Sequence, residues 1–351
     1  MAHQSTIVEN GMTYNVTEFD HTAQEIDDAV SNLGGASTPQ GAIAALGAGV
    51  RPKLNDNPFF LVNQRGQSSY TVKGYTVDRW KMGTNTATLD ILSDGVKITL
   101  NQAPSNDVRL LHQIIEDPQS LIGKTVIAAF YVTAVTGAGF RCGFRANSGT
   151  ISYQYANITQ PGLYTALFTV PSGCTELLLT TLALAGTPSG QSITISAATA
   201  EIGNTQTLAY QDDSGAWQLL ERPDPLELLK CQRYQVVYSA LGGTSESPVF
   251  SGYVSNSQKN AYFSVYLPVA MRVTPTIVIQ NLSVTIRTIS GYAPFANYES
   301  PTNIQSANHR TSKDLRCTSV YLVFQDNITP ENNTPCVVSL RTGNIIFDAN
   351  L

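Results

Sequence analysis

The stretch TVIAAFYVTAV, residues 125–135, decides the fold class of this chain. Similar runs follow it, namely LYTALFTV (163–170), TELLLTTLALA (175–185) and QSITISAATAEIG (191–203). Val, Ile, Thr, Tyr and Phe suit a pleated, half-buried surface. Because turn-forming Gly, Pro, Ser, Asn or Asp separate these short runs, the pattern is typical of a β-sandwich or barrel.

The same texture extends from Asn55 to the C-terminus, with a break in the segment SGAWQLLERPDPLELLKCQRY. Prolines in this segment end the preceding strand, and a short helix follows from Pro225. The sequence therefore predicts an all-β protein with two β-sandwich, jelly-roll-like domains over 55–222 and 233–351. A connector helix lies within 223–232. Residues 110–115, LLHQII, do not alternate and are expected to form a helical turn or an irregular connection.

Residues 1–54 form a separate, helical or extended segment in this interpretation. Thr22 and Glu25 have the spacing of a capping box and predict a helix over 22–33, and a second short helix is expected over 38–46. Isolated helices shorter than about 12–15 residues are marginal in water, so both must pack on something. They dock either on their own chain or on identical helices around a symmetry axis. The Ala-rich stripe of the second helix favours the axis, and hence attachment and trimerisation.

The composition excludes several classes of function. Charged residues make up 13% of the chain, the apolar content is 42%, and the formal net charge is -5. No basic run offers a phosphate-binding surface, so we expect no nucleic acid partner. The N-terminus MAHQSTIVENG lacks the apolar core of a secretory signal, which predicts synthesis in the bacterial cytoplasm without a signal peptide. No apolar stretch approaches the roughly 18 residues of a membrane span, so membrane insertion is not expected.

Motifs of enzymes, metals and cofactors are missing from the sequence. The four histidines lie far apart, and there is no HExxH, nucleophile elbow or P-loop. The five cysteines form no CxxC pair, so buried free thiols are expected, with a Cys317–Cys336 bridge as the alternative. Asp212 and Asp213 are interpreted as a solvated hairpin tip, with a calcium site as the alternative. The sequence thus predicts no enzyme, no catalytic residue, no metal and no cofactor.

Sugar binding requires only an aromatic face next to hydroxyl-reading polar side chains. The long segment 290–310 lacks strand periodicity and carries aromatics between polar residues, so it is the first candidate, with a trimer contact or an ordered cap as the alternative. A weaker candidate is ISYQYAN (151–157), whose Tyr153 and Tyr155 share one strand face and are core residues if that face is covered. The candidate glycan-binding residues of the long segment are Tyr292, Phe295, Tyr298, Asn303 and His309.

Five segments in order carry a family resemblance. They are TPQGAIAALGAGVRP (38–52), NPFFLVNQRGQSSYTVKGYTVDRW (57–80), DPLELLKCQRY (224–234), LPVAMRVTPT (267–276) and NIIFDANL (344–351). Together they resemble bacteriophage and prophage tail fibres or tail appendages of the receptor-binding type, with a carbohydrate-binding-module-like β-sandwich. The resemblance spans roughly residues 22–351 as a patchwork.

The resemblance implies a virion protein of the phage tail, assembled as a homotrimer. The N-terminal segment would attach to other tail or baseplate proteins, and the β domains would bind host surface polysaccharide or glycoconjugate weakly and multivalently. The alternative is a purely structural tail or decoration protein with a lectin-like fold and no glycan affinity. A glycan depolymerase is a third and more distant possibility.

Charged residues within the second of these segments also have a local interpretation. Arg65, Asp78 and Arg79 interrupt an apolar and aromatic stretch, and buried charges persist mainly when paired. We therefore expect them to pair locally. Trp80 and Tyr234 are expected in the core.

Overall fold

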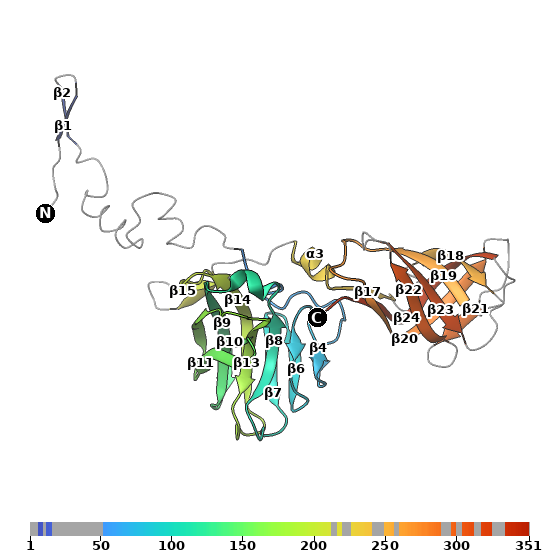
Figure 1. Ribbon diagram of the computed structural model, residues 1–351, viewed down its shortest axis with the longest axis horizontal. Coiled ribbons are helices and arrows are strands. Elements are labelled where there is room, and N and C mark those ends of the chain that lie inside the picture. The colour runs from blue at the N-terminus through green and yellow to red at the C-terminus, as the bar shows by residue number, and fades with distance from the viewer. Residues whose placement is uncertain are drawn as a thin grey trace.

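The computed structural model describes residues 6–9, 12–15, 52–211, 216–219, 226–240, 249–255, 260–288, 296–299, 304–311, 317–324 and 334–350. Near the N-terminus, β1 (Thr6–Glu9) and β2 (Met12–Asn15) pair as an antiparallel hairpin. The helices predicted over 22–33 and 38–46 lie outside the described residues, as do Asp212 and Asp213. The remaining elements form two β domains, which Figure 1 shows on either side of one short helix. The all-β prediction is confirmed.

The first domain is a sandwich of two six-stranded sheets, here named sheet I and sheet II. Sheet I contains, in spatial order, β11 (Ile151–Ile158), β10 (Phe140–Asn147), β13 (Glu176–Ala183), β8 (Val108–Ile114), β5 (Lys81–Met82) and β4 (Gly74–Tyr75). Sheet II contains β12 (Gly162–Thr169), β9 (Thr125–Thr136), β14 (Ser192–Ile202), β7 (Gly95–Leu100), β6 (Ala87–Leu92) and β3 (Ser69–Tyr70). All paired strands are antiparallel.

Alternate side chains of both sheets fill the core between them. Trp80, Phe130, Phe140 and Phe144 are among the largest fully buried side chains, so the core position predicted for Trp80 is confirmed. The expectation for residues 110–115 was wrong, because residues 110–114 belong to strand β8. This central strand is buried on both faces and carries a register shift against β13, so it lacks the two-residue alternation that marks a half-exposed strand.

Smaller elements complete the first domain and its connection to the second. A 3₁₀ turn, η1 (Pro118–Leu121), follows β8, and the hairpin of β15 (Ala209–Gln211) and β16 (Trp217–Leu219) follows β14. The connector helix α3 occupies Glu227–Gln232, slightly later than the start predicted at Pro225.

The second domain is one antiparallel sheet of eight strands, named sheet III, which encloses its own apolar core. It curls so that β20 and β22 approach each other. The strand order is β21 (Ala296–Glu299), β20 (Thr276–Thr288), β24 (Thr334–Asp348), β18 (Val249–Ser255), β19 (Asn260–Tyr266), β23 (Cys317–Phe324) and β22 (Ile304–Thr311), with β17 (Gln235–Ser239) paired to β24.

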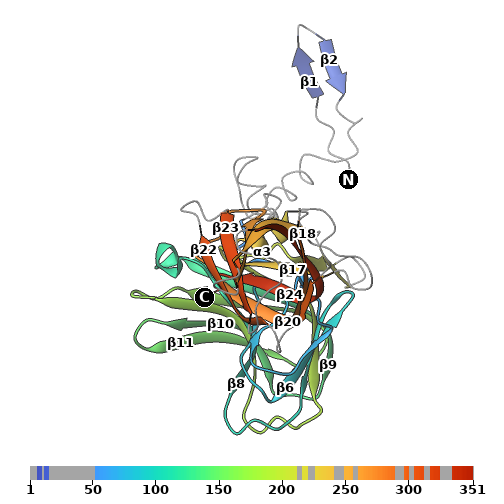
Figure 2. The same ribbon diagram turned by 90° about the vertical axis from the view of Figure 1, so that its right-hand side faces the viewer.

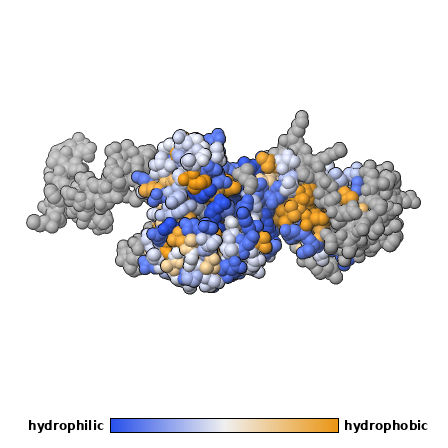
Figure 3. Space-filling view, turned by 60° about the horizontal axis from the view of Figure 1, so that its bottom comes forward, coloured by the Kyte–Doolittle hydropathy of each residue, from blue (hydrophilic) through white to orange (hydrophobic). Residues whose placement is uncertain are grey.

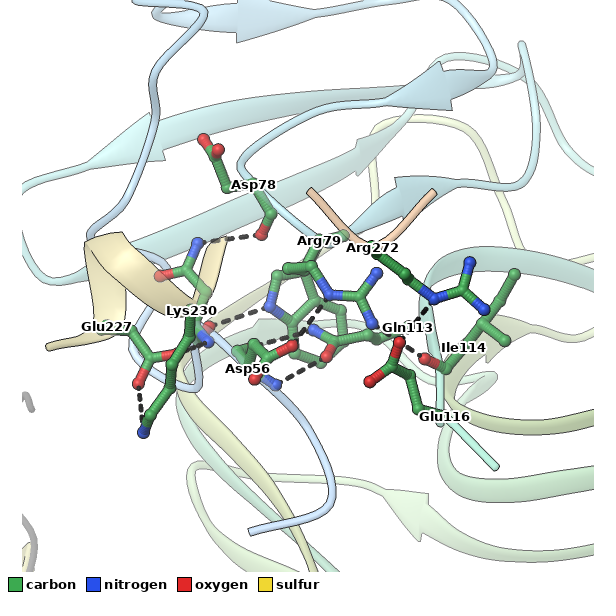
Figure 4. Close-up of polar contacts among 11 residues, drawn as sticks. Asp56, Asp78, Arg79, Gln113, Ile114, Glu116, Glu227, Lys230 and Arg272 are labelled. Carbon is green, nitrogen blue, oxygen red and sulfur yellow. Dashed lines mark hydrogen bonds and ion pairs between the residues drawn. The ribbon is translucent and has the colours of Figure 1, made fainter. Parts of the chain in front are cut away.

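Polar side chains connect the two domains around Tyr234, which follows α3. The guanidinium of Arg79 lies 3.3 Å from the centre of the Tyr234 ring, and its Nε donates to Asp56 Oδ2 at 2.9 Å. Arg272 of the second domain donates to Glu116 of the first at 2.6 Å. Figure 4 shows the contact of Arg272 with Glu116 on one side of Arg79, while Glu227 and Lys230 of α3 lie on the other.

The charged side chains of this junction also contact residues that are distant in the sequence. Although burial alone would raise it, hydrogen bonds from Tyr234 and Arg272 hold the pKa of Glu116 below its usual value. Asp78 is buried and accepts hydrogen bonds from the backbone and side chain of Gln64. Arg65 reaches Asp348 of the last strand, with N···O 3.6 Å. The predicted local pairing is confirmed for Arg79, which pairs with Asp56, but Asp78 is held by an uncharged glutamine. Arg65 pairs with the last strand instead of locally, and this contact ties the first domain to the second.

The cysteines with described side chains are free thiols. Cys142, Cys174, Cys231 and Cys336 are buried and unbridged, so the alternative Cys317–Cys336 bridge is not formed. Burial raises the pKa of the Cys336 thiol to about 11, which keeps this sulfur protonated and unreactive. No helix in the described ranges is long and apolar enough to cross a membrane.

Candidate functional site

A cavity of about 340 Å³ opens on the outer face of sheet I. It lies over β8, β10, β11 and β13, and Figure 2 shows β10 and β11 side by side along one flank of the sandwich. We call it the arginine–tyrosine cavity. Its lining consists of Asp107, Val108, Arg109, Arg141, Arg145, Ile151, Tyr153, Tyr155 and Leu182.

Two stacked tyrosines form the aromatic wall of the cavity. Tyr153 and Tyr155 are two residues apart on β11, so their side chains leave the sheet on the same face. Their ring centroids are 5.1 Å apart and the ring planes differ by 10°. Because β11 is the edge strand of sheet I and Tyr153 is 62% exposed, one ring face of this pair remains open to a ligand.

Strand β10 lies directly opposite the two tyrosines. Gly143 pairs with Tyr155, and Arg145 pairs with Tyr153. Gly143 has φ 150°, and a Cβ atom there would lie 2.1 Å from the carbonyl oxygen of Gln154. A residue with a side chain would therefore shift β11 and crowd the buried Ala166 of β12, so glycine allows β10 and β11 to pair closely at this point.

Three arginines form the charged walls. Arg109 and Arg141 both pair with Leu182 of β13, one from each side, so they leave the same face of sheet I with one strand between them. Arg141 Nε donates to Asn157 Oδ1 at 2.8 Å, and Arg145 donates to Glu176 Oε1 at 3.2 Å.

Arg109 has no ion pair with any carboxylate in the described part of the chain. The one carboxylate of the lining, Asp107, accepts a hydrogen bond from the backbone N–H of Ala185 at 2.9 Å. The lining thus carries three guanidinium groups and one carboxylate, and Glu176 beside it pairs with Arg145, which leaves an excess of positive charge. An excess of positive charge in a hollow surface is a site for an anionic group.

A buried histidine lies in the same sheet, and its burial and the positive charge of the arginines both lower its pKa. His112 on β8 is 5% exposed and pairs with Thr180 on one side and Lys81 on the other. Its Nδ1 atom has no hydrogen-bond partner among the described residues. Burial, followed by the charges of Arg109, Lys81, Arg145 and Lys73, lowers the pKa of His112 to about 3. The imidazole is therefore neutral at physiological pH.

The sequence candidates have different outcomes. The predicted shared face of Tyr153 and Tyr155 is confirmed, and the core alternative is wrong for Tyr153, which is exposed. Tyr298 lies in β21 and His309 in β22, at opposite ends of the strand order of sheet III, and their side chains are not described. Tyr292, Phe295 and Asn303 lie outside the described residues. Their role in binding stays a prediction.

Sequence reasoning missed the arginines. The alternation in FRCGFRAN was sufficient to place Arg141, Gly143 and Arg145 on one face of a strand. No local signal could bring Arg109 to the same place, because it comes from a strand paired through β13 and lies more than thirty residues earlier in the chain.

A second group of tyrosines occurs on the outer face of sheet III. Tyr253, Tyr262 and Tyr321 lie directly opposite one another on β18, β19 and β23. The first two rings are 4.8 Å apart at 8°, and the second two are 5.4 Å apart at 27°. We call this row the tyrosine ladder. The residues paired beside it, Ser264 with Ser319, are uncharged.

The hydrophobic surface of the described residues is concentrated elsewhere. Figure 3 shows a hydrophobic patch on the second domain close to the junction, while the visible face of the first domain is mainly hydrophilic. Exposed apolar side chains of the second domain include Val249, Val273 and Val278. Within the described part of the chain, no three His, Cys, Asp or Glu side chains gather in a way that could hold a metal ion.

Comparisons with known proteins identify no family for this chain. No family model matches it, and no curated protein matches it. Among solved structures it is similar to the N-terminal CBM22-1–CBM22-2 tandem domain from Paenibacillus barcinonensis Xyn10C, with 8% identity and a TM-score of 0.30. The match covers 85% of this chain and 96% of that one. A TM-score this low does not establish a common fold. We therefore draw no conclusion from this likeness about a ligand of this protein.

Proposed function

We propose that this protein binds glycans at the arginine–tyrosine cavity. The observation that carries the proposal is the open ring of Tyr153, stacked on Tyr155 at the side of a cavity with three arginines. The apolar face of a pyranose ring packs on an exposed aromatic ring, and guanidinium N–H groups donate to sugar oxygens. Recognition sites of this kind combine aromatic surface with a few placed polar groups.

The proposal is for binding without chemistry. A glycosidase requires two carboxyl groups about 5–10 Å apart across the scissile bond. The lining supplies one, that of Asp107, and its hydrogen bond to the Ala185 N–H directs it to the backbone. This supports a binding role over glycan depolymerisation.

At a finer level, we propose that the protein is a trimeric phage tail appendage that attaches to host surface glycans. This part rests on the sequence resemblance of residues 22–351 and on the expected packing of the N-terminal helices. A site with millimolar affinity contributes only about 4 kcal/mol of binding free energy. Three linked copies would raise the avidity by about 10²–10⁴ without new contacts. A monomer in light scattering at micromolar concentration would contradict the trimer.

The direct test is a glycan array probed with the purified full-length protein. Wild-type protein is expected to bind at least one class of bacterial surface glycan, and Tyr153→Ala is expected to lose that binding. Tyr253→Ala is the matched control, because it removes an exposed stacked tyrosine from the tyrosine ladder instead. A folded wild-type protein that binds no glycan would favour the purely structural alternative. Equal loss in both variants would place the site elsewhere.

A further inference from the structure

We propose that the ligand of the arginine–tyrosine cavity is an acidic glycan, whose sugar ring packs on Tyr153 and whose carboxylate lies between Arg109, Arg141 and Arg145. The inference rests on the proposed function and adds the chemical class of the ligand. Three separate features of the described residues lead to it: the geometry of the arginines, their unused N–H donors and the neighbouring aromatic ring.

The geometry places two guanidinium groups on either side of a low apolar floor. Arg109 and Arg141 stand on strands separated only by β13, and their shared partner Leu182 is 4% exposed. Neighbouring strands lie about 4.8 Å apart, so the two arginine backbones are about 10 Å apart across the floor. Long side chains at this separation can close on one small anion from both sides.

The arginines retain hydrogen-bonding capacity for such a group. A guanidinium carries five N–H donors. Arg141 uses Nε for Asn157, Arg145 uses one terminal nitrogen for Glu176, and Arg109 has no carboxylate partner in the described ranges. Guanidinium groups bind carboxylates through paired, charge-assisted hydrogen bonds, which are stronger than bonds to neutral hydroxyls. A neutral sugar would leave this excess charge uncompensated.

The electrostatic environment of the sheet supports the same sign of ligand. His112 is neutral because burial and the nearby Arg109, Lys81, Arg145 and Lys73 oppose its protonation. An anion seated among the arginines would offset part of that positive potential. The pKa of His112 would then rise on binding, although His112 does not line the cavity.

The aromatic wall and the net charge of the chain favour an acidic sugar over other anionic ligands. Arg145 is paired with Tyr153 in the strand register, so a ring on Tyr153 would hold its carboxylate within reach of Arg145. Nucleic acid also combines rings with anions, but it carries charge at every nucleotide. The chain has a net charge of -5, which disfavours such a polyanion outside the cavity.

The test is calorimetric titration of the full-length protein with oligosaccharides of one length. The probes are oligogalacturonate, its methyl ester, which keeps the ring but removes the charge, and a sialic acid oligomer as a second carboxylate source. We expect at least one acidic oligosaccharide to bind, and if it is galacturonate, the ester to bind about tenfold or more weakly. Arg109→Gln is expected to weaken acidic binding by a similar factor, whereas Arg341→Gln, a change in sheet III, leaves it unchanged.

Different failures separate the two proposals. Equal binding of acid and ester, or of a neutral oligosaccharide, would overturn the acidic class and retain glycan binding. Binding of inorganic phosphate as tightly as the sugars, unaffected by Tyr153→Ala, would overturn the sugar and leave a general anion site. Tighter binding of a DNA oligonucleotide would replace the glycan with nucleic acid. If no acidic probe binds but the glycan array shows a neutral ligand, only the further inference fails.

Discussion

The arginine–tyrosine cavity and the tyrosine ladder both contain exposed stacked tyrosines, yet they differ in what the stacking leaves open. In the cavity, Tyr153 and Tyr155 follow each other along an edge strand, and one face of Tyr153 remains free beside three arginines. In the ladder, rings from three adjacent strands cover one another, with Tyr262 in the middle. Cross-strand pairs of this kind stabilise a sheet. We therefore take stacked aromatics as a candidate binding site only where a hollow and an excess of positive charge adjoin them.

The largest expected difference between the two regions is in how far low pH reduces the stability of the domain that contains each of them. His112 has a pKa of about 3 in the folded protein against an ordinary value of 6.5, so the unfolded chain binds more protons between these values. The stabilising contribution is present above pH 6.5 and is lost as the pH falls towards 3. We expect urea unfolding of the first domain to shift to lower urea at pH 4 than at pH 7. His112→Gln should reduce that shift.

Tryptophan fluorescence is the appropriate measurement for this prediction. The two tryptophans of the chain, Trp80 and Trp217, both pack in the first domain. A midpoint with the same pH dependence in wild type and His112→Gln would show that His112 does not titrate as described.

The next largest effect is on the stability of the ladder. Tyr262→Ala removes two stacked contacts and the acceptor of the Asn260 hydrogen bond at 3.1 Å. Each aromatic pair contributes about 0.5–1.5 kcal/mol beyond its buried area, so we expect the loss of both pairs to cost about 1–3 kcal/mol. Urea unfolding followed by circular dichroism measures it. Glycan binding should be retained, and a variant that loses binding without losing stability would reverse the roles assigned to the two regions.

A smaller change in free energy is expected at Tyr153, in affinity instead of stability. Tyr153→Ala should raise the dissociation constant about tenfold or more, which is about 1.4 kcal/mol, and leave the unfolding midpoint nearly unchanged. Tyr153→Phe keeps the ring and should change affinity less than about threefold, or 0.7 kcal/mol. Titration calorimetry separates these variants. Equal losses in both would mean that the hydroxyl, and not the ring face, contacts the ligand.

The smallest expected effect is a change in affinity when Glu176 no longer competes with the glycan for Arg145. Glu176 is 39% exposed at its side chain and pairs with Arg145 at 3.2 Å. An exposed pair contributes about 0–1 kcal/mol, so its removal has little effect on stability. Glu176→Gln should free Arg145 and tighten the binding of an acidic glycan about two- to fivefold at low salt. A weaker complex would show that Glu176 positions Arg145 for the ligand instead of competing for it.

Local patterns in the sequence were sufficient for much of the fold. Runs such as TVIAAFYVTAV predicted strands because their residue types and lengths report burial directly. The shared face of Tyr153 and Tyr155 followed from the two-residue period of a strand. The same reasoning failed for residues 110–115, because a strand buried on both faces loses the alternation from which strands are recognised.

The amino-acid sequence by itself determined that this chain is an all-β protein, that a short helix separates its two β regions, and which side chains along one strand share a face. Those properties depend on neighbours a few residues apart. Only the tertiary structure decided that Arg109 lines the same cavity as Arg141 and Arg145, and that Arg79 stacks on Tyr234, which follows the distant α3. Strand neighbours are chosen by burial of the whole core, through pairings of β10 and β8 with β13. The candidate site exists because of those long-range pairings, which no local period encodes.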